Sequence, residues 1–270
     1  MVDLSVTIEN ILASFPSTGL KNIRLISLFD RQDTKFVFHI DQLNILLTAL
    51  SDTCRTLEIQ SRRIFEYGNR YFDTPGFTLY LQHHNRLRSR YKVRMRSYPV
   101  TGQTFLEIKE KNNRDRTAKA RTPLEKITTV IPPEKFDFIR DHAPVEPQTL
   151  VHALDIYFSR ITLVNTAMTE RLTIDFNFRL GYPNPVDVLD TLVIAEIKQP
   201  RFSASSRFQK IFREMKTTEM RISKYCLGTL LCYPGIKYNR FKPKLRFFHR
   251  LTQNPIYREA VYPYGYYYPV

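Results

Sequence analysis

The stretch Arg90–Arg96, RYKVRMR, places a cation at every second residue and an uncharged residue in each gap. In a β-strand, successive side chains point to opposite faces, so the four cations share one face and the other three residues share the reverse. Like charges on one face of a sheet repel each other, and no acid within the stretch relieves them. The stretch therefore predicts a strand whose charged face lies against something anionic.

The charge of the whole chain favours a polyanionic partner. Its 270 residues carry 41 Lys and Arg against 26 Asp and Glu, which gives a formal net charge of +15. The excess is concentrated, because residues 90–121 hold ten cations and three acids. Nucleic acid, phosphate chains and acidic membrane surfaces are the partner classes that such a balance favours. The length suits a single domain, including a β-barrel of this size.

The cysteines and the hydropathy exclude several other classes. Cys54, Cys226 and Cys232 form no CxxC or Cys/His spacing, so neither a disulfide framework nor a zinc site is expected, and a reducing compartment fits. The start of the chain shows no secretory signal pattern. The most apolar stretch, Leu43–Leu50, is too short to span a bilayer. We therefore expect a soluble, cytoplasmic protein without a membrane span.

The spacing of apolar residues predicts strands interrupted by a few helices. Strands are expected over residues 31–39, 65–72, 78–81, 88–98, 104–111, 117–121, 157–165, 170–178 and 192–199. Helices are expected over residues 7–15, 41–50, 205–215 and 219–231, with a short one after Pro132-Pro133. This order is typical of an antiparallel α+β fold. Residues 1–232 are predicted to form the domain, and residues 233–270 a basic, aromatic-rich C-terminal tail.

The alternation of the opening stretch recurs in other expected strands. The charged residues that alternate with apolar ones there are Glu107, Lys109 and Lys111; Lys119 and Arg121; Glu170, Arg171 and Asp175; and Glu196 and Lys198. Two architectures produce such faces: a sheet with a solvated charged face, or a closed barrel with a polar lumen whose apolar exterior is covered by helices. We favour the barrel because five strands share the bias. A lumen lined by Arg and Lys suits phosphate, and a carboxylate such as Glu196 suits a divalent metal.

A series of short motifs carries a family resemblance. In chain order they are Arg31-x-Asp33-x-Lys35, Tyr71-Phe-Asp73-Thr, Lys92-x-Arg94-x-Arg96, Glu107-x-Lys109, Lys119-x-Arg121, Tyr157-x-x-Arg160, Glu170-Arg171, Glu196-x-Lys198 and Arg221-Ile-Ser223-Lys224-Tyr. Over approximately residues 25–228 the chain resembles the VTC domain, the polyphosphate polymerase branch of the triphosphate tunnel metalloenzyme, or CYTH-like, superfamily. The chain has neither the inositol-phosphate-sensing domain nor the membrane helices of the eukaryotic proteins, so it looks like the stand-alone bacterial members.

The resemblance implies a fold and a site. The fold would be α+β, with a closed antiparallel eight-stranded β-barrel, the triphosphate tunnel, flanked by helices. The catalytic residues would be Arg94, Arg96, Lys109, Arg160 and Tyr157, with Phe158 as the alternative to the tyrosine. The phosphate-binding residues would be Lys35, Lys92, Lys119, Arg121, Arg171, Lys198, Arg221, Ser223 and Lys224. Glu196 would be the ligand of Mn²⁺ or Mg²⁺. The superfamily's ExExK signature is reduced here to Arg31-x-Asp33-x-Lys35, which leaves the number of metals open.

The expected function is transfer of the terminal phosphate of ATP to a growing polyphosphate chain. Two alternatives stay open: a tripolyphosphatase or nucleoside triphosphatase that uses the same tunnel with water as acceptor, and a non-catalytic module that binds polyanions or nucleic acid. The cations alternate within strands and do not interleave with exposed aromatics, so no stable nucleic-acid partner is expected. The partners would be ATP and polyphosphate, and the oligomeric state is left open.

Overall fold

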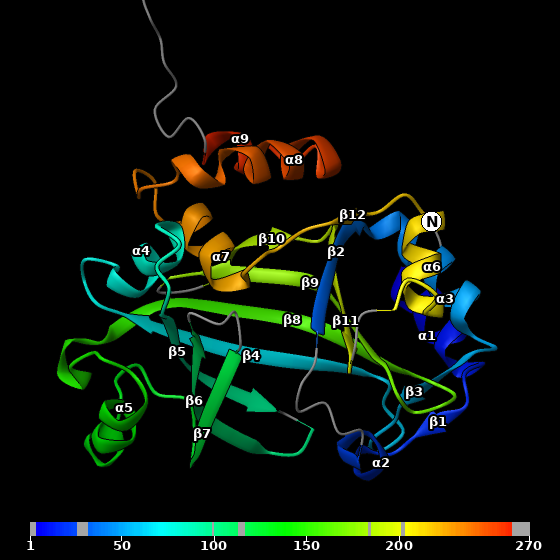
Figure 1. Cartoon of the computed structure of the whole chain (residues 1–270), viewed down its shortest axis with the longest axis horizontal. Coiled ribbons are helices and arrows are strands. Elements are labelled where there is room, and N and C mark those ends of the chain that lie inside the picture. Colours follow the sequence, from blue (N-terminus) through cyan, green and yellow to red (C-terminus); the bar gives the residue numbers. More distant parts are fainter. Residues whose placement is uncertain are drawn as a thin grey trace, which may run out of the picture. The chain divides into compact units, whose positions relative to one another are not determined.

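The computed structural model describes residues 4–25, 32–98, 100–112, 117–182, 185–200 and 203–260 (Figure 1). The chain divides into two compact units. Unit 1 comprises Met1–Glu66, Phe158–Phe178 and Leu189–Ile222, and unit 2 comprises Tyr67–Tyr157, Arg179–Val188 and Ser223–Val270. The boundary falls within strands β4 (Ile64–Asp73), β8 (Val151–Asn165) and β9 (Arg171–Gly181), so each of these strands contributes residues to both units.

Unit 1 contains one part of an antiparallel sheet and the helices that cover it. Its strands are β1 (Ser17–Thr18), β2 (Gln32–His39), β3 (Cys54–Leu57), β11 (Leu192–Gln199) and β12 (Thr218–Glu219). Its helices are α1 (Leu4–Ala13), α2 (Leu20–Leu25), the 3₁₀ helix Ile40–Gln42, α3 (Leu43–Leu50) and α6 (Arg207–Glu214). The strand order is β12-β2-β11-β9-β8, and β3 pairs with β8 and, in parallel, with β1.

The core of unit 1 lies between helices α1, α3 and α6 and one face of its sheet. The register of β2 and β11 places Phe36 opposite Ala195, and the Phe36 ring stacks on that of Phe212 from α6 at 4.2 Å between centroids. The neighbouring pair, Lys35 opposite Glu196, points to the other face. Apolar and charged residues are thus sorted to opposite sides, as the alternation predicts.

Unit 2 contains the other part of the sheet. Its further strands are β5 (Arg90–Tyr98), β6 (Gln103–Lys111), β7 (Thr117–Leu124) and β10 (Pro185–Leu189), which pairs with β9. Its helices are α4 (Thr78–His84), α5 (Phe136–His142), α7 (Lys224–Cys232), α8 (Lys242–Thr252), α9 (Ile256–Glu259) and the 3₁₀ helices Pro133–Lys135, Pro147–Thr149 and Asn239–Phe241. The strand order is β8-β4-β5-β6-β7.

The core of unit 2 includes the apolar side of β5 and β6. Val93 and Met95 lie fully buried with Leu106 and Ile108, and α5 adds Ile139 to the same cluster. The residues between the cations of the opening stretch are therefore core residues. Their burial orients the strand and leaves the cationic side chains on the opposite face.

The expected α+β class with a large antiparallel sheet is confirmed, whereas the closed barrel is not. The strands form one twelve-stranded sheet, and its main order has two ends among the described residues, β12 and β7. Alternation along a strand determines which face a side chain shares, but closure depends on pairing between edge strands, which the alternation does not specify. Within the described segments, no helix has the length and apolar character needed to cross a membrane.

Two expected elements were wrong. The segment 78–81 is the start of helix α4 and not a strand, because the Asp73 carboxylate accepts hydrogen bonds from the backbone N–H groups of Leu79 (2.9 Å) and Tyr80 (2.8 Å). These bonds satisfy donors at the helix start. The expected helix 219–231 begins only at Lys224, where Ser223 is the N-cap, and Glu219 instead belongs to β12.

Candidate functional site

Three lysines lie side by side on the cationic face of unit 2. The register places Lys92 of β5 opposite Lys109 of β6, and Lys109 opposite Lys119 of β7. Directly opposed residues on neighbouring strands point to the same face, about 4.5–5.5 Å apart at Cβ. Like charges in such positions repel each other, and an anion bound at this face would reduce the repulsion. The row lies next to a buried network of charged and polar residues.

That network is built around Arg94 and Glu107, which are directly opposite each other on β5 and β6. Arg94 is 6% exposed and Glu107 is 0% exposed. The guanidinium donates from Nε (3.0 Å) and Nη2 (2.6 Å) to Oε2 of Glu107, and from Nη1 (3.0 Å) to the Tyr71 hydroxyl. Lys119 forms a second ion pair with Glu107. One buried carboxylate thus holds two cations in place.

The charges around Glu107 and Tyr71 shift their titration. Burial alone would raise the pKa of the Glu107 carboxyl, but Arg94, Arg96 and Lys119 together bring it well below its usual value. Burial would likewise raise the pKa of Tyr71, yet Arg94 and Arg96, with a smaller effect from Lys224, lower it. Glu107 is therefore a permanent anion at neutral pH in the middle of this cationic surface.

Arg96 occupies the next position along the same face. Its Nε donates to Oδ1 of Asn69 at 2.7 Å, and its guanidinium carbon lies 5.4 Å and 5.9 Å from the ring centroids of Tyr67 and Tyr98. The side chain is 8% exposed. Hydrogen bonding on one side and aromatic rings on the others fix the guanidinium, which is the preorganisation that anion recognition needs.

The N-terminal end of helix α7 borders this network. The Tyr225 ring stacks on that of Tyr71 with 5.0 Å between centroids, and Ser223 accepts the N–H of Cys226 at 3.3 Å through its hydroxyl. Lys224 is among the charges that lower the pKa of Tyr71. The motif at residues 221–225 thus brings one further cation to the network.

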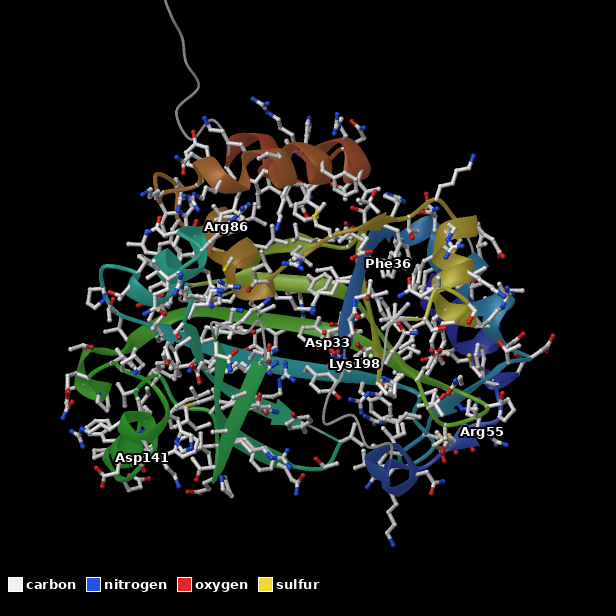
Figure 2. The ribbon with its side chains drawn as sticks, in the orientation of Figure 1. Asp33, Phe36, Arg55, Arg86, Asp141 and Lys198 are labelled. Atoms are coloured by element: carbon white, nitrogen blue, oxygen red, sulfur yellow. The ribbon has the colours of Figure 1, made fainter. Side chains whose placement is uncertain are left out.

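Unit 1 has a charged cluster of its own on β2, β9 and β11. Lys35 and Lys198 each place their ammonium 2.7 Å from a different carboxylate oxygen of Glu196, and Lys198 also lies 3.4 Å from Oδ2 of Asp33. Figure 2 shows Asp33 and Lys198 close together, whereas Phe36 points toward α6. Burial would raise the pKa of Glu196, but Lys198 and Lys35 bring it well below its usual value.

A second ion pair lies on the same part of the sheet. Arg160 of β8 donates to Asp175 of β9 from Nε (2.5 Å) and Nη2 (2.7 Å), and its guanidinium carbon lies 5.3 Å from the Phe158 ring centroid. Thr173 lies opposite Glu196, and its buried hydroxyl makes no hydrogen bond within the described residues. The face therefore combines Lys, Arg, carboxylate and hydroxyl groups.

The carboxylates of this cluster are a limited fit to a divalent metal. In the described part of the chain, no group of three or more His, Cys, Asp or Glu side chains could hold a metal ion. Both Glu196 oxygens are already held by ammonium groups. A metal that takes one or two protein carboxylates and completes its shell with water and phosphate would still fit Glu196 together with Asp33, once the lysines move to the phosphates.

The predicted site residues fall into two sets, one in each unit. Those on the charged face of unit 2 or beside it are Lys92, Arg94, Arg96, Lys109, Lys119, Arg121, Ser223 and Lys224. Those on the charged face of unit 1 are Lys35, Arg160, Arg171, Glu196 and Lys198. Arg121 is exposed, and its guanidinium lies 4.6 Å from the Phe105 ring centroid. Arg31, part of the first motif, lies outside the described residues.

Two predicted residues are not brought together with these sets. Tyr157 lies on the reverse face of unit 2. Asn69 binds Arg96 on the cationic face, so its neighbour Gly68 points to the opposite face. A Cβ added to Gly68 would lie 3.2 Å from the Tyr157 ring, which places that ring on the same opposite face. The guanidinium of Arg179 lies 5.6 Å from the Tyr157 ring centroid. Arg221 is exposed between β12 and α7.

Several residues of the network were not assigned a role from the sequence. They are Asn69, Tyr71, Glu107 and Asp175, which hold the predicted arginines in position. The pairing of Glu107 with Arg94 could have been predicted from the sequence. The expected strands 88–98 and 104–111 are joined by a short connection, and if Tyr98 pairs with Gln103, counting back along both strands pairs Arg94 with Glu107. Asn69 and Tyr71 carry no comparable signal, because their pairing with β5 spans more than twenty residues.

A comparison with models of known protein families identifies the family. Residues 30–233 match the profile of the family described as "VTC domain". A solved structure of a candidate adenylate cyclase from Bacillus halodurans is 16% identical, covers 79% of this chain and 99% of its own, and gives a TM-score of 0.50. At this identity the likeness supports the fold alone.

Two further solved structures have lower scores. A protein from Pyrococcus horikoshii OT3 is 13% identical over 74% of this chain and 98% of its own, with a TM-score of 0.43. A candidate adenylyl cyclase from Hippeastrum, described as having a dominant triphosphatase activity, is 10% identical over 76% of this chain and 99% of its own, with a TM-score of 0.41. No curated protein matches the chain by sequence.

Proposed function

Because this chain belongs to the VTC domain family, with its CYTH-like triphosphate tunnel relatives, we propose that it transfers the terminal phosphate of ATP to a growing polyphosphate chain. The observation that carries the proposal is the row Lys92, Lys109 and Lys119 beside buried Arg94 and Arg96. These five cations share the face with one carboxylate, Glu107, which holds Arg94 and Lys119, so the face carries an excess of positive charge that an anion would neutralise. A chain of phosphates supplies many anionic oxygens at close, regular intervals.

Phosphoryl transfer suits a site of this composition. The reaction needs in-line positioning and neutralisation of charge on the transferred group, with little covalent help from the protein. The bond between the terminal phosphorus and its bridging oxygen breaks, the electron pair leaves with ADP, and an oxygen at the end of the chain forms the new bond. Since that acceptor oxygen is already anionic, no general base is required. Charged side chains held in fixed positions are sufficient.

The residues divide into binding and positioning groups. Lys92, Lys109 and Arg96 would bind phosphate oxygens, because ammonium supplies a compact charge and guanidinium a fixed fork of donors. Glu107 would act as a positioning residue that holds Arg94 and Lys119. In unit 1, Lys35, Lys198 and Arg160 would likewise contact phosphate. The phosphate would compete for each of these cations with the carboxylate that now holds it.

Glu196 and Asp33 would hold Mn²⁺ or Mg²⁺ together with phosphate oxygens. The metal, when bound, neutralises negative charge on the triphosphate. We expect Mn²⁺ to strengthen tripolyphosphate binding by about tenfold or more in the wild type and not in Glu196→Gln, as judged by calorimetry with and without the metal. The informative quantity is the ratio of the affinities with and without Mn²⁺ in each protein. The affinities alone are not comparable, because the substitution removes one negative charge and so changes phosphate binding by itself. Equal strengthening in both proteins would show that Glu196 is not a ligand.

The activity itself is tested by incubation with ATP and Mn²⁺, followed by separation of the products. Long phosphate chains and ADP are expected, and Arg94→Gln with Arg96→Gln should reduce chain formation by at least about 100-fold. Arg55→Gln with Arg62→Gln is the matched control, since both residues are exposed cations in unit 1. Release of free phosphate without polymer would favour the triphosphatase. Salt-sensitive binding of oligonucleotides without turnover of ATP would favour the binding module.

A further inference from the structure

A second basic surface lies on the outside of unit 2, around helix α8. We call it the α8 surface, and its residues are Arg86, Lys237, Arg240, Lys242, Arg246 and Arg250. All but Lys242 are exposed, and Lys242 is half-buried. Nitrogen-tipped side chains project from the outer side of α8 in Figure 2, where Arg86 is labelled near α4. None of the six forms an ion pair with another described residue.

The chain supplies no acidic residues to this surface from its two contributing segments. Residues 233–258 contain seven Lys and Arg and no Asp or Glu, and residues 74–106 likewise contain no acid. On α8, Lys242, Arg246 and Arg250 follow each other at spacings of four, so they form one stripe along the helix. Like charges at this spacing destabilise a helix. An anion bound along this stripe would reduce the repulsion.

Several contacts join the two segments into one surface. The Tyr80 hydroxyl donates to the Lys237 carbonyl at 2.7 Å, and Arg240 donates from Nη1 to the Asn85 carbonyl at 3.2 Å. The Phe241 ring lies 5.7 Å from that of His84. The end of α4, which precedes Arg86, is therefore fixed against the segment that leads into α8. The contacts place Arg86 near Lys237 and Arg240, and the chain continues from there into the stripe of α8.

The chemistry of the surface distinguishes among polyanions. Base stacking by a nucleic acid requires accessible aromatic faces, but Lys242 lies over the Tyr238 ring (5.1 Å) and Lys244 over the Phe241 ring (5.7 Å). Insertion into an anionic membrane requires an apolar helix face, and that face of α8 is buried through Leu245 and Phe248. A bare phosphate chain requires neither feature. It needs only a row of cations.

We propose that the α8 surface binds polyphosphate, as a holding site for the growing chain separate from the cationic sheet face of unit 2. The inference rests on the proposed function, because the ligand is its product. A chain held at a second site stays at high effective concentration near the enzyme after each transfer. The α8 surface would therefore determine how long the chains become, with little influence on the rate of a single transfer.

The test is a triple variant, Lys242→Gln, Arg246→Gln and Arg250→Gln, in which glutamine retains helix propensity. Calorimetry with long preformed polyphosphate should show a loss of affinity of about tenfold or more, and the slope of log affinity against log salt should fall by about 2. Binding of tripolyphosphate, which is too short to need the second site, should stay at the wild-type level. The matched control is Arg55→Gln, Arg62→Gln and Lys210→Gln, which removes three exposed cations from unit 1.

The outcomes separate this inference from the proposed function. Binding to preformed chains involves no catalysis, so it can be measured even if ATP yields no polymer. Wild-type affinity for long polyphosphate in the triple variant would overturn the inference while leaving the polymerase proposal intact. Stronger binding of an RNA oligonucleotide or of anionic phospholipid vesicles than of polyphosphate by the wild type would also overturn it. If the inference holds and ATP is polymerised, the triple variant should make shorter chains at an unchanged initial rate.

Discussion

Replacing Lys92 and Lys109 with glutamine is expected to reduce polyphosphate synthesis from ATP by about 100-fold or more, with no loss of thermal stability. Removal of a single preorganised electrostatic group commonly costs about 10²–10³ in rate, and here two neighbouring ammonium groups are lost. The two residues lie directly opposite each other, so their removal also relieves repulsion within the sheet. We therefore expect a melting temperature at or above that of the wild type.

The combination of lower activity and an undiminished melting temperature makes this result specific. A residue that stabilises the fold lowers both activity and melting temperature when removed, whereas a residue placed for an anion lowers activity alone. Initial rates with ATP and Mn²⁺ and thermal unfolding by circular dichroism are the two measurements. Arg55→Gln with Lys210→Gln removes the same charge from exposed positions in unit 1 and should leave both quantities near wild type. Wild-type synthesis by the Lys92 and Lys109 variant would show that the row does not hold the substrate.

The alternation in β5 explains why much of this site could be predicted from the sequence. A period of two sorts side chains by face, so four cations in register predict a charged face, and Val93 and Met95 predict a buried one. The structure confirms both, and it shows that Arg94 and Arg96 are buried. The solvated-face alternative thus fails for these two residues, while Lys119 and Arg121 remain exposed.

Other features depend on contacts that the alternation does not encode. The segment after Asp73 forms a helix because its carboxylate caps the backbone, although its apolar residues also suit a strand. Tyr157 faces away from Arg94 because side-chain direction in β8 is set by its pairing with other strands. The ion pairs of Glu107 and Glu196 need the register of neighbouring strands, and closure of a barrel needs pairing of its edges. These contacts join residues that are far apart in the sequence, and local periodicity does not determine them.

Replacing Glu107 with glutamine is expected to lower the free energy of unfolding by about 3–5 kcal/mol at pH 7, or about 10 °C in melting temperature. The carboxylate is fully buried and holds both Arg94 and Lys119, so its loss leaves a buried guanidinium without its charged partner. The measurement is urea unfolding followed by circular dichroism. Glu134→Gln, an exposed carboxylate of the same unit, should change the free energy by less than about 0.5 kcal/mol.

The pH dependence of that difference identifies its origin. The pKa of Glu107 is lower in the folded chain than in the unfolded chain, where it is about 4.3. A carboxylate with a lowered pKa contributes stability that is fully present above its unfolded pKa and is lost as the pH falls toward its folded value. The difference in free energy of unfolding between wild type and Glu107→Gln should thus be constant from about pH 6 to 8 and shrink below about pH 4. A difference that stays constant down to pH 3 would assign the effect to shape and not to charge.

A double substitution tests whether the pair, and not either residue alone, is responsible. Exchanging both members of a buried ion pair for apolar residues of similar volume is often neutral, whereas removing one member is costly. Arg94→Met with Glu107→Leu should therefore be more stable than Glu107→Gln alone, although it would lack the guanidinium that we assign to phosphate binding. Recovery of stability without recovery of polyphosphate synthesis would show that the Arg94–Glu107 pair serves the binding of the anion that we propose for this face. The pair would then be less stabilising than apolar residues at the same positions. Failure of the double variant to recover stability would instead show that the rest of the network, including Tyr71 and Lys119, depends on the pair for its own packing.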